Sequence, residues 1–253
     1  MPLPVTRSGN PSLNERIFAS QPRPAFGEAR MTLQGTINKS FLLLVVLLCG
    51  AFYPWSQFLT NGDMSVVSTS LMVGGIGGFV LALIMSFKPT AAPYLAIPYA
   101  LLEGLAIGGI SALFESRTQG IAIQAVGLTF AVFAVMLVAY KFRIIRATER
   151  FRSIVIGATG AIALFYLVNM VLQLFHINMG IVNSSSPLGI GLSLIIVGVA
   201  ALNLILDFDF IESGANYGAP RYMEWYGAFA LLVTLVWLYM EILRLLANSR
   251  RND

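Results

Sequence analysis

The residues of this chain that could do chemistry are a few acids set within long apolar stretches. Glu103 interrupts the run LLEGL, Asp207 and Asp209 follow the uncharged run 188–206, and Glu241 lies inside the last apolar run. A charge at the centre of a membrane costs roughly 2.5 to 3.5 kcal/mol, so acids there face the protein interior and pair with other groups or bind ions. We therefore predict that the ion-binding or gating residues are among these four acids.

Asp207 and Asp209 are the strongest candidates. If their helix ends near Gly214, Asp207 lies about 9 Å inside its carboxyl end. Acidic side chains there oppose the helix dipole, which makes a purely structural role less natural. Carboxylate oxygens are ligands that Ca²⁺ prefers, so we predict a Ca²⁺ site at this pair. Arg143 and Arg146, in a basic loop, are candidate partners of these acids.

Glu103 and Glu241 each have two interpretations. Glu103, at the middle of its apolar run, is either functional or a neutral carboxyl that hydrogen-bonds to another helix. Glu241 is either part of the gate or the partner of Arg244, because the spacing of these two residues permits an ion pair within one helix. Glu241 also lies about 24 Å along the helix from Trp225, far from the expected depth of Asp207.

The composition indicates a protein that lies largely within a lipid bilayer. Of its 253 residues, 57% are hydrophobic and 11% are charged, against roughly 25% charged in soluble domains. The net charge of +4 therefore reports orientation in the membrane and does not suggest nucleic-acid binding. We expect neither enzyme activity nor a cofactor, because His176, the single histidine, has no cysteine or carboxylate cluster near it in the sequence. The single cysteine, Cys49, has no disulfide partner.

Seven segments are long and apolar enough to cross a bilayer, which takes about 20 residues each. Their short connections make neighbouring helices antiparallel and leave no extramembrane domain large enough to fold alone. We predict an all-α membrane protein: a flexible basic tail (1–39), a seven-transmembrane helical bundle (40–247) and a short polar tail (248–253). The predicted spans are 40–59, 64–87, 91–114, 120–140, 153–175, 188–206 and 225–247.

The basic residues predict the orientation of the bundle. The amino-terminal tail and the loops after the second, fourth and sixth spans hold 12 of the 16 Lys and Arg residues. The positive-inside rule places these segments, and so the amino terminus, in the cytoplasm. Seven spans then place Arg250 and Arg251 outside, against the rule. Either the last segment is re-entrant or these late charges are tolerated, and we favour tolerance.

Glycines recur at spacings that let membrane helices approach closely. We predict packing notches at Gly74 and Gly78, at Gly104 and Gly108, and at Gly157 and Gly160.

Three segments also carry a family likeness: EGL at 103–105, LILD at 204–207 and WLYMEILRLL at 237–246. With their order and the seven-span topology, they make residues 40–246 similar to the Bax inhibitor-1/YccA family, also called the transmembrane Bax inhibitor motif proteins. The long tail and the EWY opening of the last span resemble a bacterial branch. The resemblance implies a bundle in the bacterial inner membrane, with the last helix at its centre and the other six around it.

Members of this family are described as pH-sensitive calcium leak channels, gated by aspartates on helices six and seven. Asp207 matches the helix-six aspartate. An ungapped alignment of residues 242–246 with the end of the family places Thr234 or Leu235, and not Glu241, at the second aspartate. The resemblance therefore implies that this chain lacks the aspartate pair, and Thr234 lies near the expected depth of Asp207.

Two functions stay open. In the first, a cation, with Ca²⁺ the expected ion, crosses the bundle on oxygens of Asp207, Asp209 and Glu103, and protonation closes the route. In the second, the bundle conducts nothing and binds another membrane protein, such as the membrane-bound protease that bacterial members are described as modulating. The lipid bilayer is a partner in both. We favour the first because of the family likeness.

Overall fold

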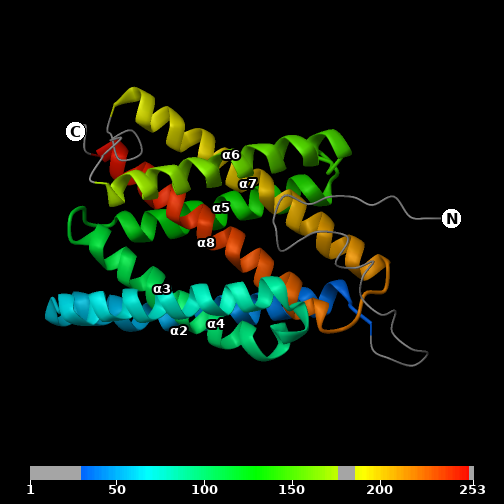
Figure 1. Cartoon of the computed structure of the whole chain (residues 1–253), viewed down its shortest axis with the longest axis horizontal. Helices are drawn as coiled ribbons and strands as arrows, with labels where there is room; N and C mark the ends of the chain where they lie inside the picture. The colour runs from blue at the N-terminus through cyan, green and yellow to red at the C-terminus, as the bar shows by residue number, and fades with distance from the viewer. Residues whose placement is uncertain (1–29, 176–185, 251–253) are drawn as a thin grey trace.

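Helices make up nearly all of the described structure (Figure 1). The computed structural model describes residues 30–175 and 186–250. Most of the predicted tail (1–29), the loop with His176 and residues 251–253 lie outside these ranges. The elements are α2 (Leu33–Asn61), α3 (Met64–Phe87), the 3₁₀ helix η1 (Pro89–Ala91), α4 (Ala92–Glu115), α5 (Ile121–Lys141), α6 (Glu149–Leu174), α7 (Pro187–Asn216) and α8 (Met223–Arg250).

Local sequence signals start and end these helices. The side chains of Thr32, Asp63 and Thr148 accept hydrogen bonds from backbone N–H groups in the first turns of α2, α3 and α6, as N-cap residues do. Gly62 ends α2 in the left-handed conformation, with φ of 65°, which glycine adopts without a steric cost. Because the cap at Thr32 precedes the apolar run, α2 begins at Leu33, inside the stretch that we expected to be tail.

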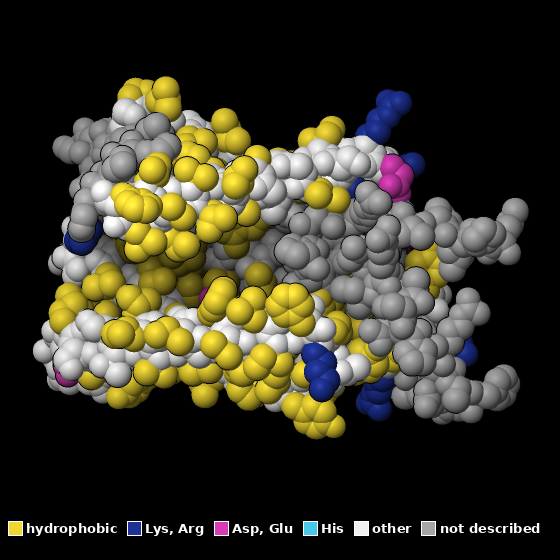
Figure 2. All heavy atoms as spheres, in the orientation of Figure 1, with side chains coloured by type: hydrophobic (Ala, Val, Ile, Leu, Met, Phe, Trp, Pro, Cys, Tyr) yellow, Lys and Arg dark blue, Asp and Glu magenta, His cyan; other side chains and the backbone are white. Residues whose placement is uncertain are grey.

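Seven of the described helices are long and apolar enough to cross a membrane, and the predicted all-α membrane bundle is confirmed. Figure 2 shows hydrophobic side chains along the length of one face of the molecule, with charged side chains mostly toward its ends. This distribution suits a protein whose middle lies in hydrocarbon and whose ends meet water.

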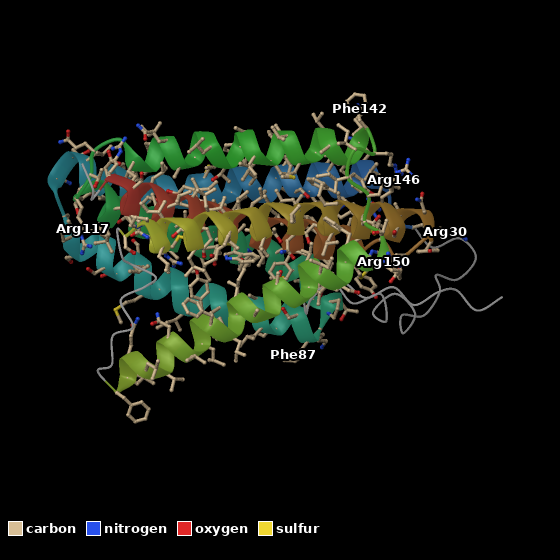
Figure 3. The ribbon with its side chains drawn as sticks, turned by 90° about the horizontal axis from the view of Figure 1, so that it is seen from above. Arg30, Phe87, Arg117, Phe142, Arg146 and Arg150 are labelled. Carbon is tan, nitrogen blue, oxygen red and sulfur yellow. The ribbon has the colours of Figure 1, made fainter. Side chains whose placement is uncertain are left out.

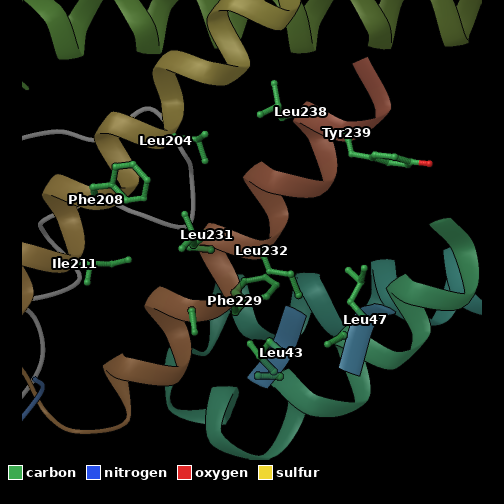
Figure 4. Packing of buried hydrophobic residues seen from close by; sticks show 14 of the residues in the cluster. Leu43, Leu47, Leu204, Phe208, Ile211, Phe229, Leu231, Leu232, Leu238 and Tyr239 are labelled. Carbon is green, nitrogen blue, oxygen red and sulfur yellow. The ribbon is translucent and has the colours of Figure 1, made fainter. Parts of the chain in front are cut away.

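The last helix is the central one, as predicted. α8 packs against α2, α4, α5 and α7, and 56% of its most apolar stretch is buried, against 6% for α6. Figure 4 shows Leu204 and Phe208 of α7 on one side of α8, and Leu43 and Leu47 of α2 on another. The immediate ring around α8 is therefore four helices, while α3 packs mainly on α4, and α6 on α7.

Close packing of α2, α3 and α4 depends on glycine. A Cβ atom at Gly104 would overlap the α2 backbone at Leu47, and one at Gly74 would overlap the α4 backbone. These two predicted notches are confirmed. The third is wrong: no described atom lies within 4 Å of a Cβ atom at Gly157 or Gly160, because both are exposed on α6.

The two ends of the bundle differ in charge. Figure 3 shows Arg30, Arg146 and Arg150 at one end and Arg117 at the other. We call the end with Arg30 the basic end. The loop between α5 and α6 lies there, so its basic residues and Arg30 gather on the same side of the bundle.

α8 crosses the whole bundle from the basic end. Its start is fixed there by the Met31 N–H, which donates to the carbonyl of Ala219 at 2.7 Å. The helix then continues without a break to Arg250, which donates to the carbonyl of Gln119 in the loop between α4 and α5, at 3.0 Å. This unbroken course favours the alternative that the late charges are tolerated.

Candidate ion-binding site between α7 and α8

Three acids of α7 face three different neighbours. Each residue turns a helix by about 100°, so Asp209 and Glu212 lie about 200° and 140° around α7 from Asp207. Their partners agree: Asp207 meets α8, Asp209 meets α6 and Glu212 meets α5. One helix therefore carries one isolated acid and two acids with basic partners.

Asp207 is buried where α7 contacts α8, with 2% of its surface exposed. The Thr234 side chain of α8 lies beside its carboxylate. The Oδ2 atom has no hydrogen-bond partner among the described residues. Asp207 lies about 14 Å along α7 from the helix end at Asn216. An unpartnered carboxyl oxygen thus lies inside the bundle, on a helix long and apolar enough to cross a membrane and about 7.5 Å along it from Glu212.

Thr234 lies beside Asp207, at the depth predicted for it. It is itself 4% exposed, and its hydroxyl also contacts the Ala230 carbonyl at 3.4 Å, one turn earlier in α8. A threonine provides an oxygen but no charge. Asp207 therefore has a polar neighbour on α8 in the place where a second aspartate was considered.

Asn203 adds a polar group that our reading of the sequence missed. It lies one turn before Asp207 on the same side of α7, is 4% exposed, and donates to the Thr159 hydroxyl of α6 at 2.8 Å. The signal was available, since an asparagine within an uncharged apolar run must find a partner across helices. A second buried polar group therefore lies one turn from Asp207, on the side away from the basic end, and bonds α7 to α6.

Asp209 and Glu212 are held by basic residues. Asp209 forms an ion pair with Arg152 in the first turn of α6. Glu212 accepts a hydrogen bond from Tyr140 of α5 and pairs with Arg143 at 2.8 Å. The predicted partner Arg143 is thus brought to an acid of α7, and Arg152 was missed because helical spacing gives no sign of a contact between different helices.

The predicted Ca²⁺ pair is not assembled. Asp209 faces away from Asp207 and has its own basic partner, because residues two apart lie on nearly opposite sides of a helix. Arg146, the other predicted basic partner, is exposed and forms no ion pair with the described residues. Within those residues, no group of three or more His, Cys, Asp or Glu side chains is placed to hold a metal ion.

Glu103 lies apart from Asp207. It belongs to α4, which packs on α8 from the layer opposite α7. Its side chain is half-buried, and its Oε2 lies 2.9 Å from the position of a Cβ atom at Gly78 of α3. The predicted set of Asp207, Asp209 and Glu103 is therefore spread over three separate places.

Glu241 is the well-partnered acid of α8. It is 2% exposed and pairs with Arg244 at 3.1 Å, as the spacing predicted. The Tyr166 hydroxyl of α6 and the Trp237 indole donate to its Oε1 at 2.8 and 3.2 Å. This cluster fastens α6 to α8 and leaves Glu241 little freedom to bind an ion.

A second buried ion pair was not predicted. Glu224, in the first turn of α8, is 3% exposed and pairs with Lys39 of α2. It also accepts from the N–H and hydroxyl of Thr32, at 2.9 and 2.8 Å. The residues are far apart in sequence, so no local pattern indicates the contact, which fastens the start of α2 to the start of α8.

Fold and site together define a class of protein. Seven apolar helices enclose a buried carboxyl with an unpartnered oxygen, as in a polytopic membrane protein with a candidate ion- or proton-binding residue inside. A family model described as Bax inhibitor 1 like matches residues 10–251. The chain belongs to this family, and the likeness seen in its sequence is confirmed. No curated protein and no solved structure gave a match.

Proposed function

We propose that this protein lets cations, with Ca²⁺ the expected ion, leak along the contact between α7 and α8, and that Asp207 is the group that binds the ion or a proton. The observation that carries the proposal is the Oδ2 atom of Asp207, which is buried without a hydrogen-bond partner among the described residues. A buried carboxyl oxygen in this state is costly, and a bound proton or cation removes the cost.

The neighbouring groups suit weak binding. Ca²⁺ takes six to eight oxygen ligands, whereas the described residues offer the carboxylate of Asp207 with the Thr234 side chain beside it, and no cluster of three or more acidic, His or Cys side chains. Water must supply the remaining ligands. Conduction requires binding that is weak enough for the ion to leave, so a single carboxylate suits a leak better than it suits storage of Ca²⁺.

A single carboxylate also determines the expected response to pH. Protonation of Asp207 removes the one negative charge that the described residues place at the site, so the flux falls as the solution becomes more acidic. Two coupled carboxylates lose their protons in two steps, whereas Asp207 beside the neutral Thr234 has one step.

The proposed setting is the inner membrane of a bacterium, with the basic end in the cytoplasm. This orientation is supported by the gathering of Arg30, Arg146 and Arg150 at one end of the bundle. The amino-terminal tail is then cytoplasmic, and α8 carries Arg250 to the outer side.

Ca²⁺ flux into proteoliposomes loaded with a calcium dye tests the proposal at about pH 6, 7 and 8. We expect the wild type to conduct less at the lowest pH, and Asp207→Asn to reduce the flux about tenfold and to remove its pH dependence, since loss of about 1.4 kcal/mol of binding is tenfold. Asp63→Asn is the control, because it makes the same change at the N-cap of α3, where asparagine caps as well as aspartate does. Thr234→Asp should give a pH response with two steps.

The proposal fails if folded wild type carries no more Ca²⁺ than empty liposomes. It also fails if Asp207→Asn conducts like the wild type at each pH. In the first case the alternative, a non-conducting regulator that binds another membrane protein such as a membrane-bound protease, becomes the better account. In the second case the ion takes another route, and Asp207 is not its site.

A further inference from the structure

A deep apolar groove lies between α2 and α5, with α7 and α8 as its floor. α2 and α5 both pack on α8 but have no substantial contact with each other, and the space between them at the basic end has a volume of about 630 Å³. Its rim is exposed, with Phe41 at 67% and Leu137 at 42%, while its floor, Phe208 and Leu231, is buried. The groove therefore opens sideways between two membrane-spanning helices, where lipid is the solvent.

The groove has the dimensions of one lipid chain in one leaflet. Its lining on α2 runs from Leu33 to Leu44, about 16 Å along the helix, which is about half of a 30 Å hydrocarbon core. A second apolar cavity of about 360 Å³ continues from it toward the opposite end and shares Leu44, Phe130 and Leu235 with it. The groove's own volume, about 630 Å³, is in the usual range of ligand sites, roughly 300 to 1,000 Å³.

Charged residues stand only at the basic end of this lining. Lys141 and Arg143 are there, together with Glu212. Lys141 is exposed and forms no ion pair with the described residues, while Arg143 pairs with Glu212 at 2.8 Å. The described lining therefore has one uncompensated positive charge at the level of the membrane surface.

Arg143 holds its position at a cost. Its φ is 57°, the only positive φ of a non-glycine residue among those described. It follows the end of α5, where the next N–H, of Ile144, returns to the Ala139 carbonyl at 2.9 Å, a helix end that usually has glycine. The strained residue places its guanidinium 5.5 Å from the centre of the Tyr140 ring, at the mouth of the groove. Strain of this kind is retained where the side chain has a use.

We propose that this groove binds one anionic phospholipid of the leaflet at the basic end. An acyl chain fills the space between α2 and α5, and the phosphate meets Lys141 and Arg143. Guanidinium and ammonium groups are the partners that phosphate prefers, and the apolar rim excludes a soluble phosphate ester as the main occupant. Neither Asp207 nor Thr234 belongs to the lining, so the lipid proposal does not depend on the proposed function.

Native mass spectrometry of the full-length protein in detergent tests the proposal, with phosphatidylglycerol and phosphatidylcholine that carry identical acyl chains as probes. The double variant Lys141→Gln with Arg143→Gly removes both charges and also relieves the left-handed strain, so it should fold. At about fivefold for each of the two charges, we expect its affinity for phosphatidylglycerol to fall about 25-fold, with little change for phosphatidylcholine. Lys88→Gln, at the exposed end of α3, is the matched control.

A groove-filling variant tests the position of the chain. Leu137→Trp narrows the rim, and Leu128→Trp makes the same change on α5 outside the groove; the two side chains are 42% and 45% exposed. We expect Leu137→Trp alone to weaken binding of both lipids. The proposal is overturned if phosphatidylglycerol and phosphatidylcholine bind the wild type equally, if the double variant behaves like Lys88→Gln, or if the two tryptophan variants bind alike.

Discussion

Two buried acids on neighbouring helices allow a direct test of which one is structural. Asp207→Asn and Glu241→Gln make the same change, from a carboxylate to an amide of nearly the same shape. Glu241 accepts from Tyr166, Trp237 and Arg244, and both of its oxygens are in use. Asp207 has one oxygen without a partner among the described residues. The two substitutions should therefore differ in their effect on stability.

The expected size of the difference follows from the contacts. A hydrogen bond to a charged group contributes about 1.5 to 3 kcal/mol. Glu241→Gln turns the 3.1 Å bond from Arg244 into a contact between two donors, and the 25% exposure of Arg244 keeps the loss near the lower limit. We expect its free energy of unfolding to fall by about 1.5 to 2 kcal/mol. Asp207→Asn keeps an oxygen for Thr234 and should change stability by no more than about 0.5 kcal/mol.

Reversible unfolding in mixed micelles of a nonionic detergent and dodecyl sulfate, followed by far-ultraviolet circular dichroism, measures both values. Trp237→Phe is a useful control, because it removes one donor from Glu241 and leaves the ion pair with Arg244 intact. The reasoning is refuted if Asp207→Asn lowers stability as much as Glu241→Gln does. That result would mean that Asp207 is held by its surroundings and has a structural role.

Two further predictions concern packing and the basic end. Gly104→Ala should lower the free energy of unfolding by about 1 to 3 kcal/mol, because the added Cβ overlaps the α2 backbone. Gly127→Ala has open space around the added Cβ and should raise the free energy of unfolding by up to about 1 kcal/mol. The same unfolding assay measures both. Arg152→Gln should speed amide hydrogen exchange in the first turns of α6, because it removes the ion pair with Asp209. Arg150 is an exposed neighbour, and Arg150→Gln should leave the exchange unchanged.

The helices could be predicted from the sequence because each span is a long apolar run between polar turns. The prediction of seven spans depended only on length and hydropathy, and the central place of α8 came from the family resemblance. The helix ends were harder to predict. α2 starts at Leu33 because Thr32 caps it, and α7 continues to Asn216, ten residues past the predicted span 188–206. Caps and terminal turns are fixed by a few polar contacts, which a hydropathy pattern does not register.

The site was predictable one residue at a time but not as an arrangement. Asp207 was identified because a carboxylate at membrane depth needs a reason, and Glu241 was correctly paired with Arg244 because both lie on one helix. Contacts between helices carry no such signal, so Arg152 and the pair of Lys39 with Glu224 were missed. The grouping of Asp207 with Asp209 treated closeness in sequence as closeness in space, which a helix does not allow for residues two apart.

The ion pairs at the basic end bear on how a leak at Asp207 would be limited. A cation that leaves Asp207 toward the basic end passes the levels of Asp209 and Glu212, which lie on other sides of α7 and are paired with Arg152 and Arg143. While these pairs persist, the two carboxylates add no net attraction for the cation. Opening of the pairs would leave two uncompensated negative charges near its path, about 3 and 7.5 Å beyond Asp207 on the helix axis. Under the proposed function, then, Asp207 determines whether the ion is bound, and the two arginines determine how readily it leaves.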